Sequence, residues 1–122
     1  GNSIIVNTDF AAKNPKLITG FIRAVAKGWN EAIKNPSDAV KSMIKRNPAA
    51  DLELETRRLR LAIEGNVVTE HTKANGMGSI DPSRMERAIQ QLAENYQFEN
   101  SPQIELYFTD KYLPKDGSLS LK

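Results

Sequence analysis

The side chains that could take part in chemistry are few and scattered along this chain. His71 is the only histidine, and there is no cysteine, which excludes a thiolate nucleophile, a disulfide and a thiolate metal site. A metal site needs several converging ligands, whereas the neighbour of His71, Glu70, points elsewhere on a helix. We therefore interpret His71 as a surface or capping histidine, and we predict no metal site and no cofactor.

Nucleophilic and acid–base catalysis find little support either. Serine, histidine and aspartate are all present, but no serine lies in a G-x-S-x-G turn and no motif pairs one with His71. Glu53 and Glu55 are two residues apart on a predicted helix, where their side chains diverge. Because no constellation of residues can carry a reaction, the sequence predicts that the chain is not an enzyme.

Three further motifs have simple structural interpretations. The Gly76-Met77-Gly78 stretch lacks the third glycine of a dinucleotide loop and the lysine of a P-loop, so it reads as a turn before a helix. Arg57, Arg58 and Arg60 lie beside acidic residues on an amphipathic helix. A net charge of +2, from 17 basic and 15 acidic residues, gives no case for nucleic acid. Trp29 lies on an apolar stripe, which favours packing in a core.

The elements that position these residues are mainly helices. Four dipeptides combine a capping side chain with a proline, which is typical of a helix start: Asn14-Pro15, Asn35-Pro36, Asp81-Pro82 and Ser101-Pro102. Apolar spacing then predicts a short turn at 9–13 and helices at about 15–34, 36–45, 51–64, 69–74 and 82–96. Gly65 is expected to cap the fourth of these segments at its C-terminal end.

The helix predicted over 15–34 is the longest and carries one apolar face. Seven apolar residues recur at helical spacing along it: Leu17, Ile18, Phe21, Ile22, Val25, Trp29 and Ile33. Gly20 and Gly28 lie in its interior, where glycine costs up to ~1 kcal/mol relative to alanine. Close approach of a neighbouring element is one explanation for these glycines.

A single β-strand is predicted at the start of the chain, where Ser3 to Asn7 contains Ile4, Ile5 and Val6. No second strand is evident, and a lone buried strand would leave its backbone N–H and C=O groups unpaired. Its partners therefore come from sequence outside this chain, or two copies of the chain pair. We expect an irregular aromatic segment at 97–114 and a polar, disordered tail at 115–122.

Several stretches resemble one family. They are "NSIIVNTDF" at residues 2–10, "KNPKLITGFIRAVAKGWNEAIKNPSDAV" at 13–40, "NPAADLELETRRLRLAI" at 47–63, "NGMGSIDPSRMERAIQQLAENYQF" at 75–98 and "LYFTDKYLP" at 106–114. In order and spacing they are similar to the C-terminal region of ABC-transporter solute-binding proteins. The similar branch binds nitrate, sulfonate, taurine and thiamine pyrimidines, and its superfamily includes fungal thiamine-pyrimidine synthases.

That resemblance implies a fold and a function. Residues 1–114 would be a mainly α segment with one N-terminal strand, the C-terminal part of a two-lobe α/β periplasmic-binding-protein-like fold. The whole protein would capture a small polar solute by lobe closure and present it to an ABC permease from a periplasmic or lipid-anchored extracellular location. Gly1, Asn2 and Ser3 would lie near the hinge and the ligand, although an ordinary strand entry explains them equally well.

Two alternatives remain open at this point. One is a pyrimidine-precursor synthase of the same fold, which would need a reactive histidine or a metal-binding cluster that this segment does not supply. The other is a free-standing helical interaction module, which would be a monomer without exposed apolar surface. For a segment of a larger fold we expect instead that the isolated chain self-associates through its uncovered strand edges and helix faces.

Overall fold

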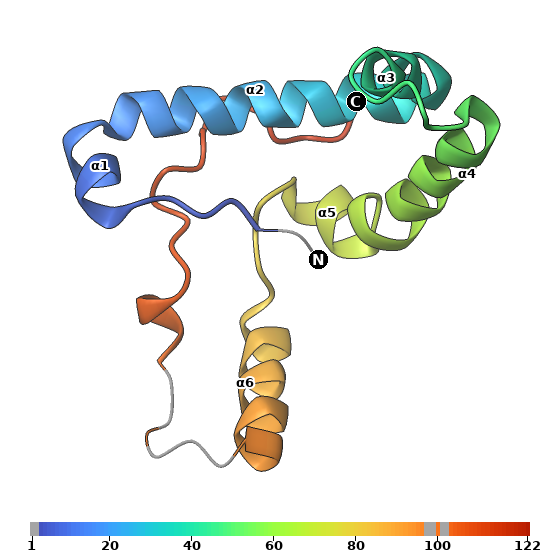
Figure 1. The fold of residues 1–122 in the computed structure, drawn as a ribbon. Helices are drawn as coiled ribbons and strands as arrows, with labels where there is room; N and C mark the ends of the chain where they lie inside the picture. The colour runs from blue at the N-terminus through green and yellow to red at the C-terminus, as the bar shows by residue number, and fades with distance from the viewer. Residues whose placement is uncertain (1–2, 97–99, 101–102) are drawn as a thin grey trace.

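The computed structural model describes residues 3–96, 100 and 103–122, and in these residues the chain folds as helices joined by loops (Figure 1). The helices are α1 (Thr8–Lys13), α2 (Pro15–Lys34), α3 (Pro36–Ile44), α4 (Leu52–Ala62), α5 (Glu70–Asn75) and α6 (Pro82–Tyr96). A π-helical turn follows α4 at Ile63–Val67, and a 3-10 turn lies at Ile104–Leu106. Every helix predicted from the sequence is therefore present, with small differences at the ends.

The proline-marked helix starts are confirmed at three positions, but the capping chemistry differs among them. The Asp81 carboxylate accepts hydrogen bonds from the Ser83 N–H at 3.0 Å and from the Ser83 hydroxyl at 2.9 Å. Asn14 and Asn35 do not accept such bonds from the helices they precede. Their amide groups donate instead, to the Phe10 carbonyl and the Asp38 carboxylate respectively. The fourth predicted start, Ser101-Pro102, lies outside the described residues.

Gly65 does not cap a helix as predicted. The helix continues through it as a π-helical turn, closed by a hydrogen bond of 2.8 Å from the Val68 N–H to the Ile63 carbonyl. Gly65 lacks the positive φ of a glycine cap, which Gly76, Gly78 and Gly117 have. The Gly76-Met77-Gly78 turn between α5 and α6 is confirmed.

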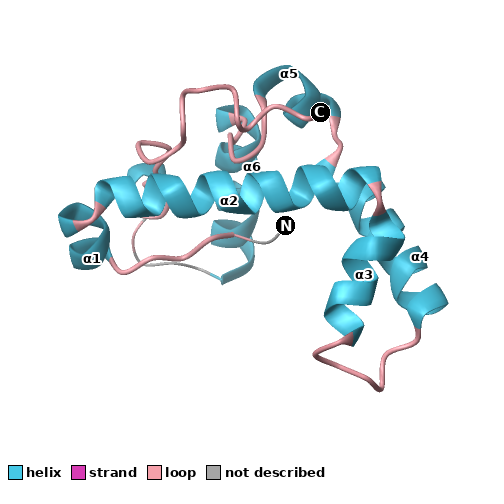
Figure 2. Ribbon diagram, turned by 90° about the horizontal axis from the view of Figure 1, so that it is seen from above, coloured by secondary structure: helices cyan, strands magenta, loops and turns pink. Residues whose placement is uncertain are grey.

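The strand predicted over Ser3–Asn7 is not formed within one copy of the chain. Residues 3–7 have no regular structure, and none of the described residues is in a strand (Figure 2). Ile5 is 93% exposed, so the segment is not buried either. The physical reason is that a strand exists only through hydrogen bonds to a neighbour, and no neighbouring strand is available in this part of the chain.

Helix α2 is the central element of the fold (Figure 1). The extensive packing lies along it and at its C-terminal end: α1 packs on α2, α3 packs on both α2 and α4, and α4 runs into the π-helical turn. Helices α5 and α6 do not take part in this packing, and α6 extends away from α2 (Figure 1). After the 3-10 turn, the chain returns to α2 and ends near its junction with α3 (Figure 1).

The apolar core is small for a chain of this size. Apart from Pro114, the buried apolar residues among those described are Ala11, Ile18, Ala26, Val40, Ile63 and Met77. The chain exposes 9616 Å², whereas a compact monomer of 13.6 kDa exposes roughly 6,600 Å². The difference is about 3,000 Å², well above the ~800 Å² that one partner contributes to a standard protein interface. Much surface that a compact domain would cover is therefore open.

The polar tail predicted to be disordered is instead attached to α2. Arg23 on α2 forms an ion pair with Asp116 at 2.7 Å, and Asn30 on α2 hydrogen-bonds to Ser120 and Lys122. Composition alone indicates disorder for these residues because few of them are apolar. Main-chain hydrogen bonds order them, and such bonds leave no trace in composition.

Candidate functional site

The residues predicted to lie near a ligand are only partly described. Gly1 and Asn2 lie outside the described residues, and Ser3 is exposed at the start of the irregular N-terminal segment.

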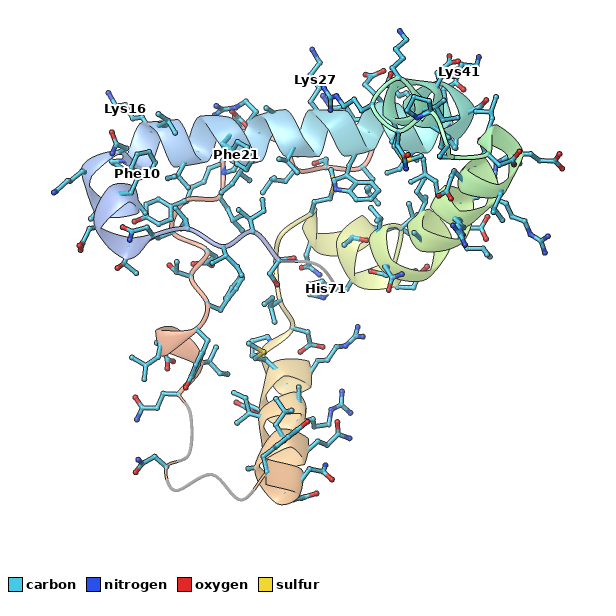
Figure 3. All side chains as sticks on the ribbon, in the orientation of Figure 1. Phe10, Lys16, Phe21, Lys27, Lys41 and His71 are labelled. Carbon is cyan, nitrogen blue, oxygen red and sulfur yellow. The ribbon has the colours of Figure 1, made fainter. Side chains whose placement is uncertain are left out.

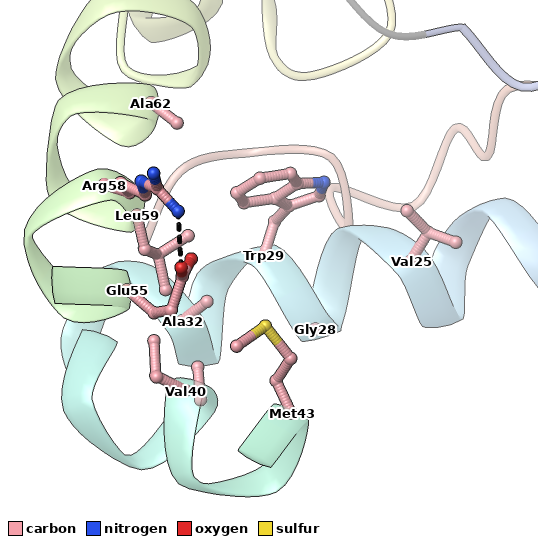
Figure 4. Close-up of a pocket in the computed structure, with 11 residues that line it drawn as sticks. Val25, Gly28, Trp29, Ala32, Val40, Met43, Glu55, Arg58, Leu59 and Ala62 are labelled. Carbon is pink, nitrogen blue, oxygen red and sulfur yellow. Dashed lines mark hydrogen bonds and ion pairs between the residues drawn. The ribbon is translucent and has the colours of Figure 1, made fainter. Parts of the chain in front are cut away.

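A groove lies between α2, α3 and α4, with a volume of ≈ 510 Å³ (Figure 4). Its walls are mostly apolar; from α2 come Val25, Gly28, Trp29 and Ala32, from α3 Ala39, Val40 and Met43, and from α4 Glu55, Arg58, Leu59 and Ala62. Trp29 is half-buried and lines the groove, so the predicted packing role holds only in part.

The charged groups at the groove neutralise each other. Arg58 Nη1 lies 2.6 Å from Glu55 Oε1, one helical turn away on α4 (Figure 4). The Glu55 side chain is mostly covered, whereas that of Arg58 is exposed. Because this pair is already satisfied, the groove lacks a free charge that would hold a small polar solute. Its chemistry suits apolar side chains or a ring instead.

His71 has a partner that the sequence did not indicate. His71 Nε2 lies 2.9 Å from the Ser79 hydroxyl, and His71 Nδ1 lies 3.4 Å from the amide nitrogen of Asn75. Ser79 Oγ also lies 3.2 Å from the Gly76 carbonyl, to which it donates. Ser79, His71 and Asn75 are thus connected by successive hydrogen-bond contacts. A nucleophile, its base and an orienting residue are connected in the same order.

The hydrogen-bond directions are nevertheless opposite to those of a nucleophile. The Asn75 amide N–H₂ donates to Nδ1, so the proton of the neutral imidazole is on Nε2. Nε2–H then donates to the Ser79 oxygen, whose own proton goes to the Gly76 carbonyl. A general base must instead accept the serine proton at this nitrogen. This cluster therefore links α5 to the turn that follows it; the cap of α5 is formed by Thr69 and Thr72, not by His71.

Asn30 joins α2 to the end of the chain, a role that the sequence did not indicate. It is 5% exposed and is the buried polar side chain of the described residues. Its Nδ2 donates to the Ser120 carbonyl at 3.0 Å, and its Oδ1 accepts from the Lys122 N–H at 2.9 Å. We call residues 116–122, which Asn30 and Arg23 hold against α2, the C-terminal clasp.

Asp116 is the first residue of the C-terminal clasp and attaches it to α2. Its carboxylate accepts from the hydroxyl and N–H of Ser118 and from Arg23. These bonds, the Ser118 hydroxyl first and Arg23 second, lower the pKa of Asp116 to about 2. Since they favour the ionised form, Asp116 stays charged and bound to α2 throughout the neutral range.

No three histidine, aspartate or glutamate side chains of the described residues converge as a metal ion would require. Among the same residues, no helix combines the length and the apolar character needed to span a bilayer.

Residues 1–39 match the model of a family described as NMT1/THI5 like. The match covers the N-terminal segment, α1, α2 and the first residues of α3, and it supports a coarse relationship to the periplasmic-binding family. No curated protein and no solved structure matches the chain.

Proposed function

We propose that this chain is the C-terminal, helical part of a two-lobe solute-binding protein that serves an ABC importer. The observation that carries the proposal is the similarity of residues 1–39 to the NMT1/THI5-like family. The finer assignment to an importer of nitrate, sulfonate, taurine or thiamine-pyrimidine type rests on the sequence resemblance over the remaining residues. In this proposal the protein works outside the cytoplasm, in the periplasm or on a lipid anchor, and delivers its solute to a membrane permease.

The uncovered flank of α2 supports a place within a larger fold. Leu17 and Phe21 lie on this flank and are 57% and 53% exposed, although their spacing is that of a core-facing stripe. In Figure 3, Lys16 and Lys27 project from the opposite side of the helix. A stripe that is apolar and still open is what a helix presents when its packing partner belongs to another polypeptide segment.

The interior glycines of α2 fit the same proposal. A Cβ atom at Gly20 or Gly28 would meet nothing within 4 Å, so the neighbour that these glycines led us to expect is not in the described part of this chain. Gly28 also lines the apolar groove. We propose that the lobe preceding this segment covers the Leu17–Phe21 flank and reaches into the groove.

The proposed mechanism is binding, with no covalent step. Two lobes close around the solute, which shifts an open–closed equilibrium toward the form that the permease accepts. Ser3, with Gly1 and Asn2, would contribute from the hinge, while most contacts would come from the preceding lobes. The protonation of the His71–Ser79 pair supports a binding role over catalysis, because it leaves the serine without a base.

The decisive experiment joins residues 1–122 to the polypeptide encoded immediately before Gly1. Isothermal titration calorimetry with a thiamine pyrimidine, taurine and nitrate should show binding by the joined protein to at least one of them. Ser3→Trp should weaken that binding, whereas the matched Lys16→Trp, on the solvent-facing side of α2, should not. A preceding reading frame without α/β lobes, or a joined protein that binds none of these solutes, would contradict the proposal.

A further inference from the structure

We infer that the C-terminal clasp is a conformational lock, which binds α2 through its main chain and fixes the turn between α5 and α6. The position of α5 and α6 relative to α2 then depends on the last residues of the chain. This inference stands on the hydrogen bonds within residues 23–122 and does not require the proposed transport function.

Asn30 recognises the backbone of the clasp. Its amide donates to the carbonyl of Ser120 and accepts from the N–H of Lys122, the two main-chain groups that flank Leu121. A strand offers the same pair of groups to its neighbour in a sheet. The side chain of Asn30 therefore makes the two hydrogen bonds that a partner strand would make. Since the side chains of Ser120 and Lys122 make neither bond, recognition here depends on the main chain.

The other side of the clasp holds the turn after α5. The Leu119 carbonyl accepts a hydrogen bond from the Met77 N–H at 2.8 Å. A Cβ at Gly76 would lie 3.2 Å from that carbonyl oxygen, and a Cβ at Gly78 would lie 3.0 Å from the Leu113 side chain. Both glycines have positive φ, so a side chain at either position would be strained, and it would also press on Leu119 or Leu113. The clasp contacts α2 on one side and residues 76–78 on the other.

This bridge is important because α5 and α6 lie outside the extensive helix packing. Helices α1 to α4 pack on one another, and the hydrogen bonds of the clasp link the 76–78 turn to α2. When the clasp detaches, the Met77 N–H loses its acceptor at Leu119 and the Asn30 side chain loses its bonds to Ser120 and Lys122. Attachment is therefore cooperative: Asn30 and Met77 gain or lose their partners together.

The test uses amide hydrogen exchange on the full chain with a matched pair of variants at its last residue. Lys122→Pro removes the N–H that donates to Asn30, while Lys122→Ala keeps it. We expect exchange at Met77, more than 40 residues away, to accelerate on the order of 10-fold in Lys122→Pro. Lys122→Ala should leave it within about twofold of the parent chain. Asn30→Ala should accelerate amide exchange at Met77 at least as much as Lys122→Pro does.

The Glu55 amide serves as the internal reference, because it bonds to the Asp51 carbonyl in α4, away from the clasp. The lock is supported if amide exchange in Lys122→Pro accelerates at Met77 and does not accelerate at Glu55. It is overturned if Lys122→Pro leaves Met77 protected, if Lys122→Ala has the same effect as Lys122→Pro, or if Glu55 accelerates equally in Lys122→Pro. In that last case the variant loosens the whole molecule, and the clasp has no separate role.

Discussion

The guanidinium group of Arg23 and the carboxylate of Asp116 lie 2.7 Å apart, although 93 residues separate them in the sequence. Arg23 Nε donates to the same carboxylate oxygen at 2.8 Å. The second carboxylate oxygen accepts from the N–H and the hydroxyl of Ser118. Asp116 thus connects a turn in the C-terminal clasp to the middle of α2, and each of these contacts favours its ionised form.

The pH dependence of the clasp follows from this carboxylate. Its pKa is lowered from 3.8 to about 2, by Ser118 first and Arg23 second. Because the folded-state pKa lies below the unfolded one, the contribution of Asp116 to stability is present above the unfolded pKa of 3.8. It is lost as the pH falls through about 2. Carbon-detected NMR titration of the Asp116 carboxyl should report that low value.

Two variants separate the causes of the Asp116 shift. Ser118→Ala and Arg23→Ala should each raise the pKa of Asp116, because the serine hydroxyl and the guanidinium group both hold it low. After either substitution the pKa should remain below 3.8, since the other contacts persist. An Asp116 that titrates at its ordinary value in the parent chain would show that the attachment to α2 is not formed in solution.

The open flank of α2 should make the isolated chain associate. We expect the 122-residue chain to bind an environment-sensitive apolar dye and to form larger species in light scattering. Phe21→Glu should weaken association on the order of 10-fold, because burying a phenylalanine contributes ~1.5–3 kcal/mol. The matched variant Lys27→Glu, on the opposite side of α2, should leave both signals unchanged. A monomer that binds no dye would refute the expectation.

Substitutions at two glycines should differ in their cost. Gly76 has φ 81° and ψ 171°, a region open essentially to glycine alone, where other residues lose about 1–3 kcal/mol. Its Cβ would also lie 3.2 Å from the Leu119 carbonyl oxygen. Gly117 has φ 77° but open space around it. Urea unfolding should therefore show a larger loss of stability for Gly76→Ala than for Gly117→Ala; equal losses would mean that the clasp does not press on Gly76.

The His71–Ser79 pair should be structural. Nitrogen NMR should find the neutral His71 ring protonated on Nε2, and a fluorophosphonate probe should leave Ser79 unmodified. Ser79→Ala should cost about 0.5–1.5 kcal/mol of stability, the usual net contribution of one hydrogen bond. A Ser79 that reacts covalently with the probe, or a ring protonated on Nδ1, would reopen the catalytic interpretation.

The sequence by itself determined the local structure. The bounds of α2 and α6 agree with the prediction, because proline at the first turn and apolar spacing act within a few residues of each other. The Gly76–Gly78 turn was predictable for the same reason: only glycine adopts its backbone angles at little cost. The partner of His71, Ser79, was not predictable from local pattern.

Tertiary structure alone decided the attachment of the C-terminal clasp. Asn30 and its partners are 90 and 92 residues apart, and Asn30 binds main-chain groups that every residue except proline carries. Such contacts have no sequence signature, so a polar tail was expected to be disordered. The same reasoning applies to the segment at Ile4 to Val6. Its β-branched residues favour an extended strand, but a strand forms only where a partner backbone lies beside it, and three-dimensional neighbours decide that.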